Sequence, residues 1–528
     1  MSDSNGLPPR PAIGVSAMLA RTVQVRGSAT AAIDGDRRQT WAGYADRVAR
    51  GASALRALGV REGDRVAILA LTSMEFFELL AAVPRAGGIM VPLNWRWSVA
   101  ELLHAMADCE PTVLLFDERM AEVGRELAQA RPGMKVVALS PGLAGLPVYG
   151  ALVDAAMPGE DAGRGGDDVY QLGYTGGTTG SSKAAMLTHR NVLSEASYCW
   201  AEGILRADSI YLLNGPMFHA AGTWPALSLI GSGGTAVLMP QFEPREALRL
   251  IEAHGVTESL LVPTAIQMLV EHPEFARYDT ASLVSILYGA APITETLLDR
   301  AIAAFPHAQF VQCYGMTELS PVCAILPHRY LQGEHRARGR NRAAGLALPG
   351  VQIRIVDPAD NEVPRGAVGE IAVRGETVMA GYWRRPEESR QAMRGGWMHT
   401  GDAGFMDEDG LIYIVDRIKD VIISGGENVF STEVENALAS HPAVRQVAVV
   451  GIPDEKWGEA VHAIVRFHEG VTATTEEIIA HARLSIAAYK VPRSVEVWQG
   501  EFPVSPANKV LKRELRRTYW EGRDRTIV

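Results

Sequence analysis

The segment from residue 174 to residue 183 limits the fold of this chain more than any other segment does. It reads Tyr-Thr-Gly-Gly-Thr-Thr-Gly-Ser-Ser-Lys and lies between an apolar extended run, residues 169–174, and a predicted helix at about residues 189–204. In α/β folds, a loop between a strand and a helix is where phosphates bind. Glycine lets backbone N–H groups approach a ligand closely, hydroxyl groups donate hydrogen bonds and lysine adds a positive charge, which together suit a polyphosphate. We therefore expect an α/β fold in which ATP is bound by Thr175, Gly176, Gly177, Thr178, Thr179, Gly180 and Lys183.

This loop differs from the phosphate loop of nucleotide kinases. That loop requires glycine directly before its lysine and serine or threonine directly after it. Here Ser182 and Ala184 flank Lys183. The sequence therefore indicates chemistry other than that of a kinase.

The composition indicates a globular chain. With 528 residues, 47% of them hydrophobic, it is long enough for three or four domains or subdomains with substantial cores. No apolar run approaches the roughly 20 residues that span a bilayer, and residues 1–11 carry no apolar signal core, which predicts a disordered lead-in and a cytoplasmic protein. The net charge of −10 argues against nucleic acid as a partner. Four cysteines are too few for a disulfide framework and form no CxxC metal site, so we expect them to be reduced and buried.

The periodicity of the apolar residues changes along the chain. Residues 12–165 and 166–345 alternate helical patterns with short apolar strands, which predicts two layered α/β subdomains. Over residues 346–416 the period becomes two, as in a small β-rich subdomain. A hinge at residues 417–420 is expected to join this large N-terminal domain to a small mobile α+β domain, residues 421–528.

A helix is expected near the start of the C-terminal domain. Thr432 and Glu435 have the spacing of a capping box, in which each side chain bonds the backbone N–H of the other residue. Val434 and Leu438 would form the buried face of this helix.

Six further motifs follow the loop. They are Tyr-Gly-Ala-Ala-Pro at 288–292, Tyr-Gly-Met-Thr-Glu at 314–318, Trp-Met-His-Thr-Gly-Asp at 397–402, Asp-Arg-Ile-Lys-Asp at 416–420, Ser-Gly-Gly-Glu-Asn at 424–428 and Asn-Lys at 508–509. In this order and spacing they closely resemble the adenylate-forming superfamily of acyl-CoA synthetases, firefly luciferase and peptide-synthetase adenylation domains. The resemblance extends from about residue 12 to residue 517 and is greatest to bacterial fatty-acyl and feruloyl-type CoA ligases.

The resemblance implies a nucleotide site at these motifs. The flat ring of Tyr314 and a wall with few side chains suit an adenine. Asp402 can accept hydrogen bonds from two ribose hydroxyls, and Arg417 can donate to the same sugar and phosphate. Glu318 supplies hard oxygen ligands for a Mg²⁺ ion that bridges phosphates. The expected nucleotide contacts also include Gly289, Ala290, Ala291, Cys313, Gly315, Met316 and Thr317.

The resemblance also implies a reaction in two steps. A carboxylate attacks the α-phosphorus of ATP, which gives acyl-AMP and pyrophosphate, and a thiol then takes the acyl group. Lys509 is the expected cation of the first step, together with Thr178, Thr179 and Lys183. For the second step the small domain would turn about Lys419. It would then present Gly425, Gly426 and Glu427 to the pantetheine of coenzyme A.

Taken singly, each of these residues has an ordinary structural interpretation. A glycine-rich loop can be a plain turn, Gly289 can end a buried strand, and Glu318 can be an acidic residue at a helix start. Asp402 can belong to a surface turn, and Lys509 can be a solvated charge. His219, which matches a gate between the acyl pocket and the thiol tunnel, can equally be a buried histidine with its hydrogen bonds satisfied.

The segments expected to line the acyl pocket are almost free of charge. Apart from Glu318 they contain no Asp, Glu, Lys or Arg, and a buried charge without a partner is costly. We therefore expect an apolar substrate, either a medium-chain fatty acid or an aromatic acid of the cinnamate or arylpropionate kind. The expected pocket residues are His219, Thr223, Trp224, Tyr288, Gly289, Met316 and Val322.

Two alternatives to a coenzyme A ligase stay open. The chain can load a separate carrier protein, or it can be an enzyme of low activity or a non-catalytic protein that binds ATP or acyl-AMP. The second alternative arises because Ala184 stands where the family usually has glycine, and alanine adopts left-handed backbone angles poorly. Asn508 also replaces a usual glycine, but asparagine tolerates those angles. The sequence also leaves a homodimer open.

Overall fold

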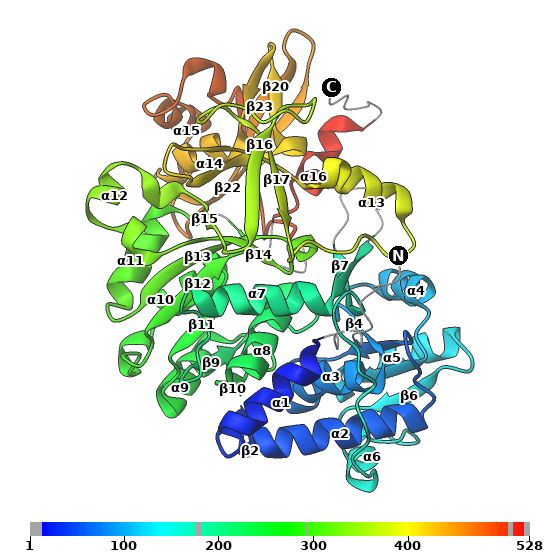
Figure 1. Cartoon of the computed structure of the whole chain (residues 1–528). Coiled ribbons are helices and arrows are strands. Elements are labelled where there is room, and N and C mark those ends of the chain that lie inside the picture. The colour runs from blue at the N-terminus through cyan, green and yellow to red at the C-terminus, as the bar shows by residue number, and fades with distance from the viewer. Residues whose placement is uncertain (1–12, 176–181, 292, 505–509, 522–528) are drawn as a thin grey trace.

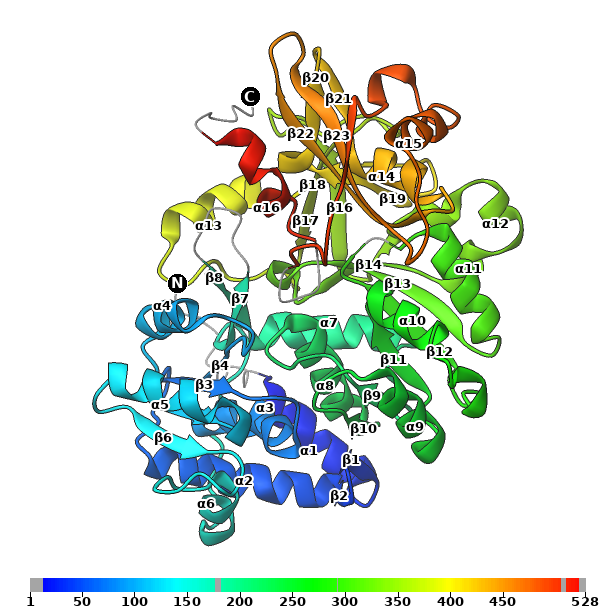
Figure 2. The same ribbon diagram turned by 180° about the vertical axis from the view of Figure 1, so that it is seen from behind.

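The computed structural model describes residues 13–175, 182–291, 293–504 and 510–521. Two large sheets lie in the N-terminal domain, and the C-terminal domain lies above them in Figures 1 and 2. The predicted fold class, a large N-terminal α/β domain of several sheets with a smaller C-terminal α+β domain, is confirmed.

The first large sheet has six strands. Its strands run parallel except for β8, which pairs antiparallel with β7 and leaves Thr175 and Lys183 opposite each other. The loop with the phosphate-binding pattern therefore connects two neighbouring strands of a hairpin. In sheet order the strands are β6 (Lys135–Ala138), β5 (Val113–Phe116), β3 (Arg65–Leu69), β4 (Ile89–Pro92), β7 (Val169–Thr175) and β8 (Lys183–Thr188).

The second large sheet has nine strands and is parallel over its centre. Strands β14 and β2 pair antiparallel with their neighbours. In sheet order the strands are β15 (Leu346–Ala347), β14 (Val322–Leu326), β13 (Gln309–Gly315), β12 (Ser285–Gly289), β11 (Glu258–Leu261), β9 (Ile210–Leu213), β10 (Thr235–Leu238), β1 (Thr30–Asp34) and β2 (Arg37–Thr40).

Helices cover both faces of both sheets. The largest core cluster joins the inner faces of the two sheets through α1 (Val15–Arg26), α2 (Trp41–Ala57), α3 (Met74–Ala86), α6 (Tyr149–Ala155), α7 (His189–Ala201) and α8 (Ala220–Ser232). Helices α4 (Val99–Cys109) and α5 (Ala121–Ala130) cover the outer face of the first sheet. Helices α9 (Pro244–His254), α10 (Pro263–Val270) and α11 (Glu295–Ala304) cover that of the second, at the outer edge of the molecule in Figures 1 and 2.

The C-terminal half of the chain forms two smaller sheets. The first contains β16 (Val351–Val356), β17 (Gly369–Gly375), β18 (Met398–Met406) and β19 (Ile412–Arg417). The short helix η7 (Ile418–Asp420) leads to the second, which contains β20 (Ile422–Ser424), β21 (Glu427–Val429), β22 (Val444–Asp454), β23 (Gly458–Phe467) and β24 (Ser494–Val497). The remaining α-helices are α12 (Gly333–Ala337), α13 (Pro386–Ala392), α14 (Ser431–Ala439), α15 (Thr475–Ala482) and α16 (Lys512–Arg516).

Two expectations about local organisation were wrong. The division at residue 165 separates strands that the sheets combine, because β1 pairs with β10 in the second sheet and β7 pairs with β4 in the first. The capping box is absent, because Glu435 instead accepts a hydrogen bond from the backbone N–H of Val449 and forms an ion pair with Lys512.

Two further findings concern the whole described chain. All four cysteines are buried and free, as expected. Within the described ranges, no helix combines the length and the apolar character that a membrane crossing requires.

Candidate active site

Tyr314, Asp402 and Arg417 meet where the nine-stranded sheet contacts the four-stranded sheet. The Tyr314 hydroxyl, near the end of β13, donates a 2.8 Å hydrogen bond to Asp402 Oδ2 in β18. Arg417, the last residue of β19, places Nε 2.6 Å from Asp402 Oδ1. Tyr314 and Asp402 are buried, whereas the Arg417 side chain is 39% exposed and faces solvent in part. Three sequence-predicted residues from three strands thus form one hydrogen-bonded group.

Glu318 lies in the short helix η3 (Thr317–Leu319), directly after β13, and is buried. The Tyr382 hydroxyl donates a 2.8 Å hydrogen bond to its Oε1. Burial raises the pKa of Glu318, and Tyr382, Arg417 and Lys183 oppose that rise. Lys183 Nζ is 5.4 Å from the centre of the Tyr382 ring. The Glu318 carboxylate, which is expected to bind the metal ion, therefore interacts electrostatically with both Arg417 and Lys183.

Two glycines let the backbone pass closely at this place. A Cβ on Gly289 would lie 2.2 Å from the carbonyl oxygen of Cys313, and one on Gly315 would lie 2.0 Å from that of Pro321. Ala290 has a φ of 64°, in the left-handed region. These contacts explain physically why the predicted adenine wall is made of residues with little or no side chain.

Lys183 begins β8 opposite Thr175, whose hydroxyl donates a 3.3 Å hydrogen bond to the Lys183 carbonyl oxygen. Ala184 is the next residue of the same strand and pairs with Tyr174. Its backbone is extended, and its carbonyl oxygen accepts a 2.8 Å hydrogen bond from the Trp383 N–H. No left-handed angle is therefore required at Ala184, and alanine fits the backbone there. Gly176, Gly177, Thr178, Thr179, Gly180 and Lys509 lie outside the described residues.

His219 occupies the N-cap of α8, and its Nδ1 accepts a 3.2 Å hydrogen bond from the backbone N–H of Ala221. Thr223 and Trp224 follow in the same helix and are buried. Val322 begins β14 and belongs with Trp224 to the core cluster between the two sheets. Met316 packs against that cluster and is half-buried.

Tyr288 does not belong with these residues. Residues alternate between the two faces of a strand, so Leu287 packs between the sheets whereas Tyr288 packs beneath the outer helices. Its ring contacts Phe310, and its hydroxyl donates to Gln312 Oε1 at 3.3 Å. The expectation that Tyr288 lines the acyl pocket was wrong.

The expected thiol-side residues lie in the C-terminal domain. Gly425 and Gly426 form the turn between β20 and β21 with φ angles of 65° and 85°, which favour glycine. The Gly425 N–H donates a 2.8 Å hydrogen bond to the Trp457 carbonyl oxygen, and Glu427 is exposed. Lys419 lies in η7 at the junction of the two domains, where burial lowers its pKa.

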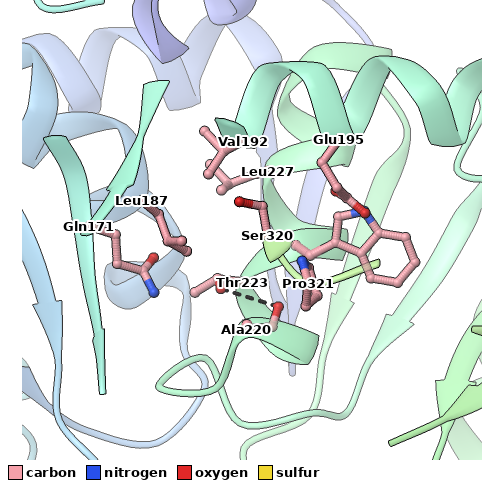
Figure 3. Close-up of a pocket in the computed structure, with 10 residues that line it drawn as sticks. Gln171, Leu187, Val192, Glu195, Ala220, Thr223, Leu227, Ser320 and Pro321 are labelled. Carbon is pink, nitrogen blue, oxygen red and sulfur yellow. Dashed lines mark hydrogen bonds between the residues drawn. The ribbon is translucent and has the colours of Figure 1, made fainter. Parts of the chain in front are cut away.

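A small cavity lies between α7, α8 and the segment after Glu318 (Figure 3). One of its lining residues is a glutamate that the sequence analysis had not predicted there. Glu195 projects into it from α7 and is 1% exposed. A signal was present, because Val192, Glu195 and Cys199 have the spacing of the buried face of a helix. The lining residues are Gln171, Leu187, Val192, Glu195, Ala220, Thr223, Trp224, Leu227, Ser320 and Pro321.

Comparison with known proteins agrees with this geometry. Residues 19–383 match the family model described as AMP-binding enzyme, and residues 433–509 match that of the AMP-binding enzyme C-terminal domain. The chain belongs to the AMP-binding enzyme family. It is an AMP-forming enzyme of the acyl-CoA synthetase class, as the motifs predicted.

Three similar proteins cover nearly all of this AMP-binding enzyme. A feruloyl-CoA synthase from Amycolatopsis sp. is 39% identical, with 96% of this chain and 99% of that protein aligned. The fatty acid–acyl-carrier-protein ligase ScoC of Streptomyces coeruleorubidus is 35% identical over 90% of this chain and 91% of its own. The crystal structure of ATP-bound MatB from Rhodopseudomonas palustris has a TM-score of 0.86 and 30% identity, and covers 96% of this chain and 99% of its own.

Proposed function

We propose that this enzyme joins an aromatic acid of the cinnamate or arylpropionate kind to coenzyme A through an acyl adenylate. The observation that carries the proposal is the group formed by Tyr314, Asp402 and Arg417 beside buried Glu318. The Tyr314 ring suits an adenine, and the Asp402 carboxylate suits the ribose hydroxyls. Arg417 and Lys183, which interact with Glu318, suit the phosphates of a nucleoside triphosphate.

In the first step a carboxylate oxygen of the acid attacks the α-phosphorus of ATP. The bond from that phosphorus to the β-phosphate oxygen breaks, and pyrophosphate leaves. Lys183 and Lys509 balance negative charge on the phosphates, and Tyr314 and Asp402 hold the nucleoside. In the second step the thiolate of coenzyme A attacks the acyl carbon, and AMP leaves.

The residues present fit a magnesium ion. Among the described residues no cluster of three or more His, Cys, Asp or Glu could enclose a metal. Magnesium bound with ATP needs only one or two carboxylates beside the phosphates, and buried Glu318 meets that need. When bound, the ion neutralises phosphate charge. Tyr382 orients the Glu318 carboxylate through its hydrogen bond.

The closed end of the acyl pocket favours an aromatic acid over a long chain. A Cβ on Gly231 in α8 would lie 2.3 Å from the Trp200 ring of α7, so the two helices are in close contact. Trp224 and Glu195 line the small cavity between the helices, which leaves little room for a long acyl chain. The 39% identity to a feruloyl-CoA synthase supports the same substrate class.

Coenzyme A is the proposed acceptor, in the cytoplasm where ATP and coenzyme A are available. The similarity to ScoC keeps a carrier-protein thiol as the second candidate. The arginines of a basic cluster at residues 336–342 all have partners within the chain. Each of its arginines pairs with a carboxylate: Arg336 with Asp299, Arg338 with Glu334, Arg340 with Asp409 and Arg342 with Glu295.

The proposal is tested by AMP release from ATP in the presence of Mg²⁺ over a panel of cinnamates, arylpropionates, benzoates and straight-chain acids. The expected result is coenzyme A-dependent AMP release with cinnamates or arylpropionates, and a thioester identified by mass. Acyl-AMP formation without transfer to coenzyme A would favour a carrier protein as acceptor. Turnover of straight-chain acids alone would contradict the proposed substrate class.

A further inference from the structure

The buried carboxyl group of Glu195 has an incomplete set of hydrogen bonds. Its Oε1 accepts a 3.4 Å hydrogen bond from Cys199 Sγ, whereas its Oε2 is buried and makes none within the described part of the chain. A further polar atom of the same cavity, Gln171 Nε2, is buried and likewise lacks a hydrogen-bond partner there, whereas Trp224 Nε1 lies beside the Glu195 carboxyl group. Buried polar groups are nearly always hydrogen-bonded, so two such atoms around one cavity, Glu195 Oε2 and Gln171 Nε2, indicate a polar occupant.

The surroundings of Glu195 keep its carboxyl group neutral. The ten lining residues include no Lys, Arg or His. Burial raises the pKa of Glu195 well above its ordinary value, and contacts with Cys199 and Trp224 only partly oppose that rise. A protonated carboxyl can donate one hydrogen bond through its hydroxyl and accept another through its carbonyl oxygen. Glu195 is therefore equipped to bind a neutral group rather than a cation.

The position of the cavity connects it with the acyl pocket. Ala220 and Thr223 are in the first turn of α8, directly after His219, and Ser320 and Pro321 follow directly after η3, which contains Glu318. Figure 3 shows Glu195, Ser320 and Pro321 around the same cavity. The space open to the centre of a water molecule is about 10 Å³. A cavity of that size holds about one water molecule or one hydroxyl group.

We propose that Glu195 is a specificity-determining residue that hydrogen-bonds a hydroxyl group at the end of the acid remote from its carboxylate. The preferred substrates are then hydroxylated aryl acids, whose hydroxyl takes the place of a water in this cavity. The inference rests on the proposed function, because it concerns the same acyl pocket. A site with unpaired buried polar atoms rejects an analogue that lacks the matching hydroxyl.

The test compares kcat/KM for 4-hydroxycinnamate and for cinnamate in the wild-type enzyme, Glu195→Gln and Glu195→Leu. We expect the wild-type enzyme to prefer the hydroxylated acid by about 10-fold or more. Glu195→Leu should bring this ratio close to one, chiefly by lowering kcat/KM for the hydroxylated acid. Glu195→Gln retains a donor and an acceptor and should keep most of the preference. Glu202→Leu, at the exposed C-cap of the same helix, is the matched control and should leave the ratio unchanged.

Failure of this inference can be told apart from failure of the proposed function. Cinnamate turnover with a hydroxyl preference that Glu195→Leu leaves intact would overturn only the role of Glu195. A wild-type preference for 4-(aminomethyl)cinnamate would also overturn it, because an ammonium group requires an ionised Glu195. If neither acid releases AMP, both proposals fail. Should Glu195→Leu not fold, inhibition of the wild-type enzyme by non-reactive acyl-AMP analogues with and without the hydroxyl decides, and equal inhibition overturns the inference.

Discussion

Gly289 ends β12 beside β13, and the packing there leaves no room for a methyl group. The carbonyl oxygen of Cys313 would lie 2.2 Å from a Cβ at this position, far inside van der Waals contact. The next residue, Ala290, already has a left-handed backbone, so the chain leaves the strand under constraint. Tyr314 follows Cys313 directly, which couples the geometry of this strand end to the residue expected to bind adenine.

We expect Gly289→Ala to lower the free energy of unfolding by about 2 kcal/mol and to raise the KM for ATP, because strand β13 must shift to accommodate the methyl group. Urea unfolding and ATP saturation curves measure the two effects. Gly150→Ala is the matched control, since nothing lies within 4 Å of its added Cβ and the residue is helical. The control should be neutral or stabilising by about 0.5–1 kcal/mol. An equal effect of the two substitutions would contradict this account.

Helices α14 and α16 are joined by a buried group of charges next to the hinge. Lys512 Nζ lies 2.7 Å from Glu435 Oε1 and donates a 2.6 Å hydrogen bond to Ser431 Oγ. Ser431 Oγ in turn donates to Asp416 Oδ2 at 2.7 Å, in the strand that precedes the hinge. Burial raises the pKa of both Asp416 and Glu435, and Lys512 opposes both rises. Lys512 therefore compensates two buried carboxylates, and it stands three residues after Lys509.

We expect Lys512→Met to destabilise the C-terminal domain by about 3 kcal/mol, because it leaves two buried carboxylates without a cation. Hydrogen–deuterium exchange of peptides that cover α14 and α16 measures the loss locally. Lys490→Met removes a similar 2.7 Å pair with Glu433, whose side chain is 40% exposed, and should cost less than about 1 kcal/mol. Unchanged exchange in α16 of Lys512→Met would show that the group does not hold this helix.

At the scale of the whole molecule, the candidate site lies next to the junction of the two domains. Asp402 and Arg417 come from the last two strands of the N-terminal domain, and η7, which contains the expected hinge residue Lys419, follows at once. Arg516 of α16 donates a 3.4 Å hydrogen bond to the Lys419 carbonyl oxygen, so α16 contacts η7 at the expected hinge. The turn at Gly425, expected to face the thiol, and Lys509 both belong to the C-terminal domain in sequence. A rotation about the hinge would therefore move both groups together.

We expect Lys509→Ala to slow formation of the acyl adenylate by about 100-fold or more, because it removes a cation from the developing phosphate charge. Conversion of supplied acyl-AMP to the thioester should change only a few-fold, since that step follows withdrawal of Lys509. Single-turnover measurements of the two half-reactions separate the effects, with Lys490→Ala as the control. Equal losses in both half-reactions would contradict a division of labour between two domain positions.

The sequence by itself determined the bounds of several helices and the identity of the motif residues, because both depend on neighbouring residues in the chain. Apolar periodicity predicts helices at residues 41–57, 74–86 and 244–254, and α2, α3 and α9 have these bounds. The ordered motifs likewise identified Tyr314, Glu318, Asp402 and Arg417 before any contact between them was known. Family membership and fold class needed nothing beyond these patterns.

Tertiary structure alone decided the rest, because the energies concerned arise between residues far apart in the chain. β1 joins β10 across about 200 residues, which no local pattern encodes. Tyr288 faces the outer helices rather than the pocket, since the order of the strands sets which face is which. Glu435 does not cap α14, because it pairs instead with Lys512 and with the backbone N–H of Val449. Glu195 became a candidate for specificity only when folding enclosed its carboxyl group between two helices without a cation.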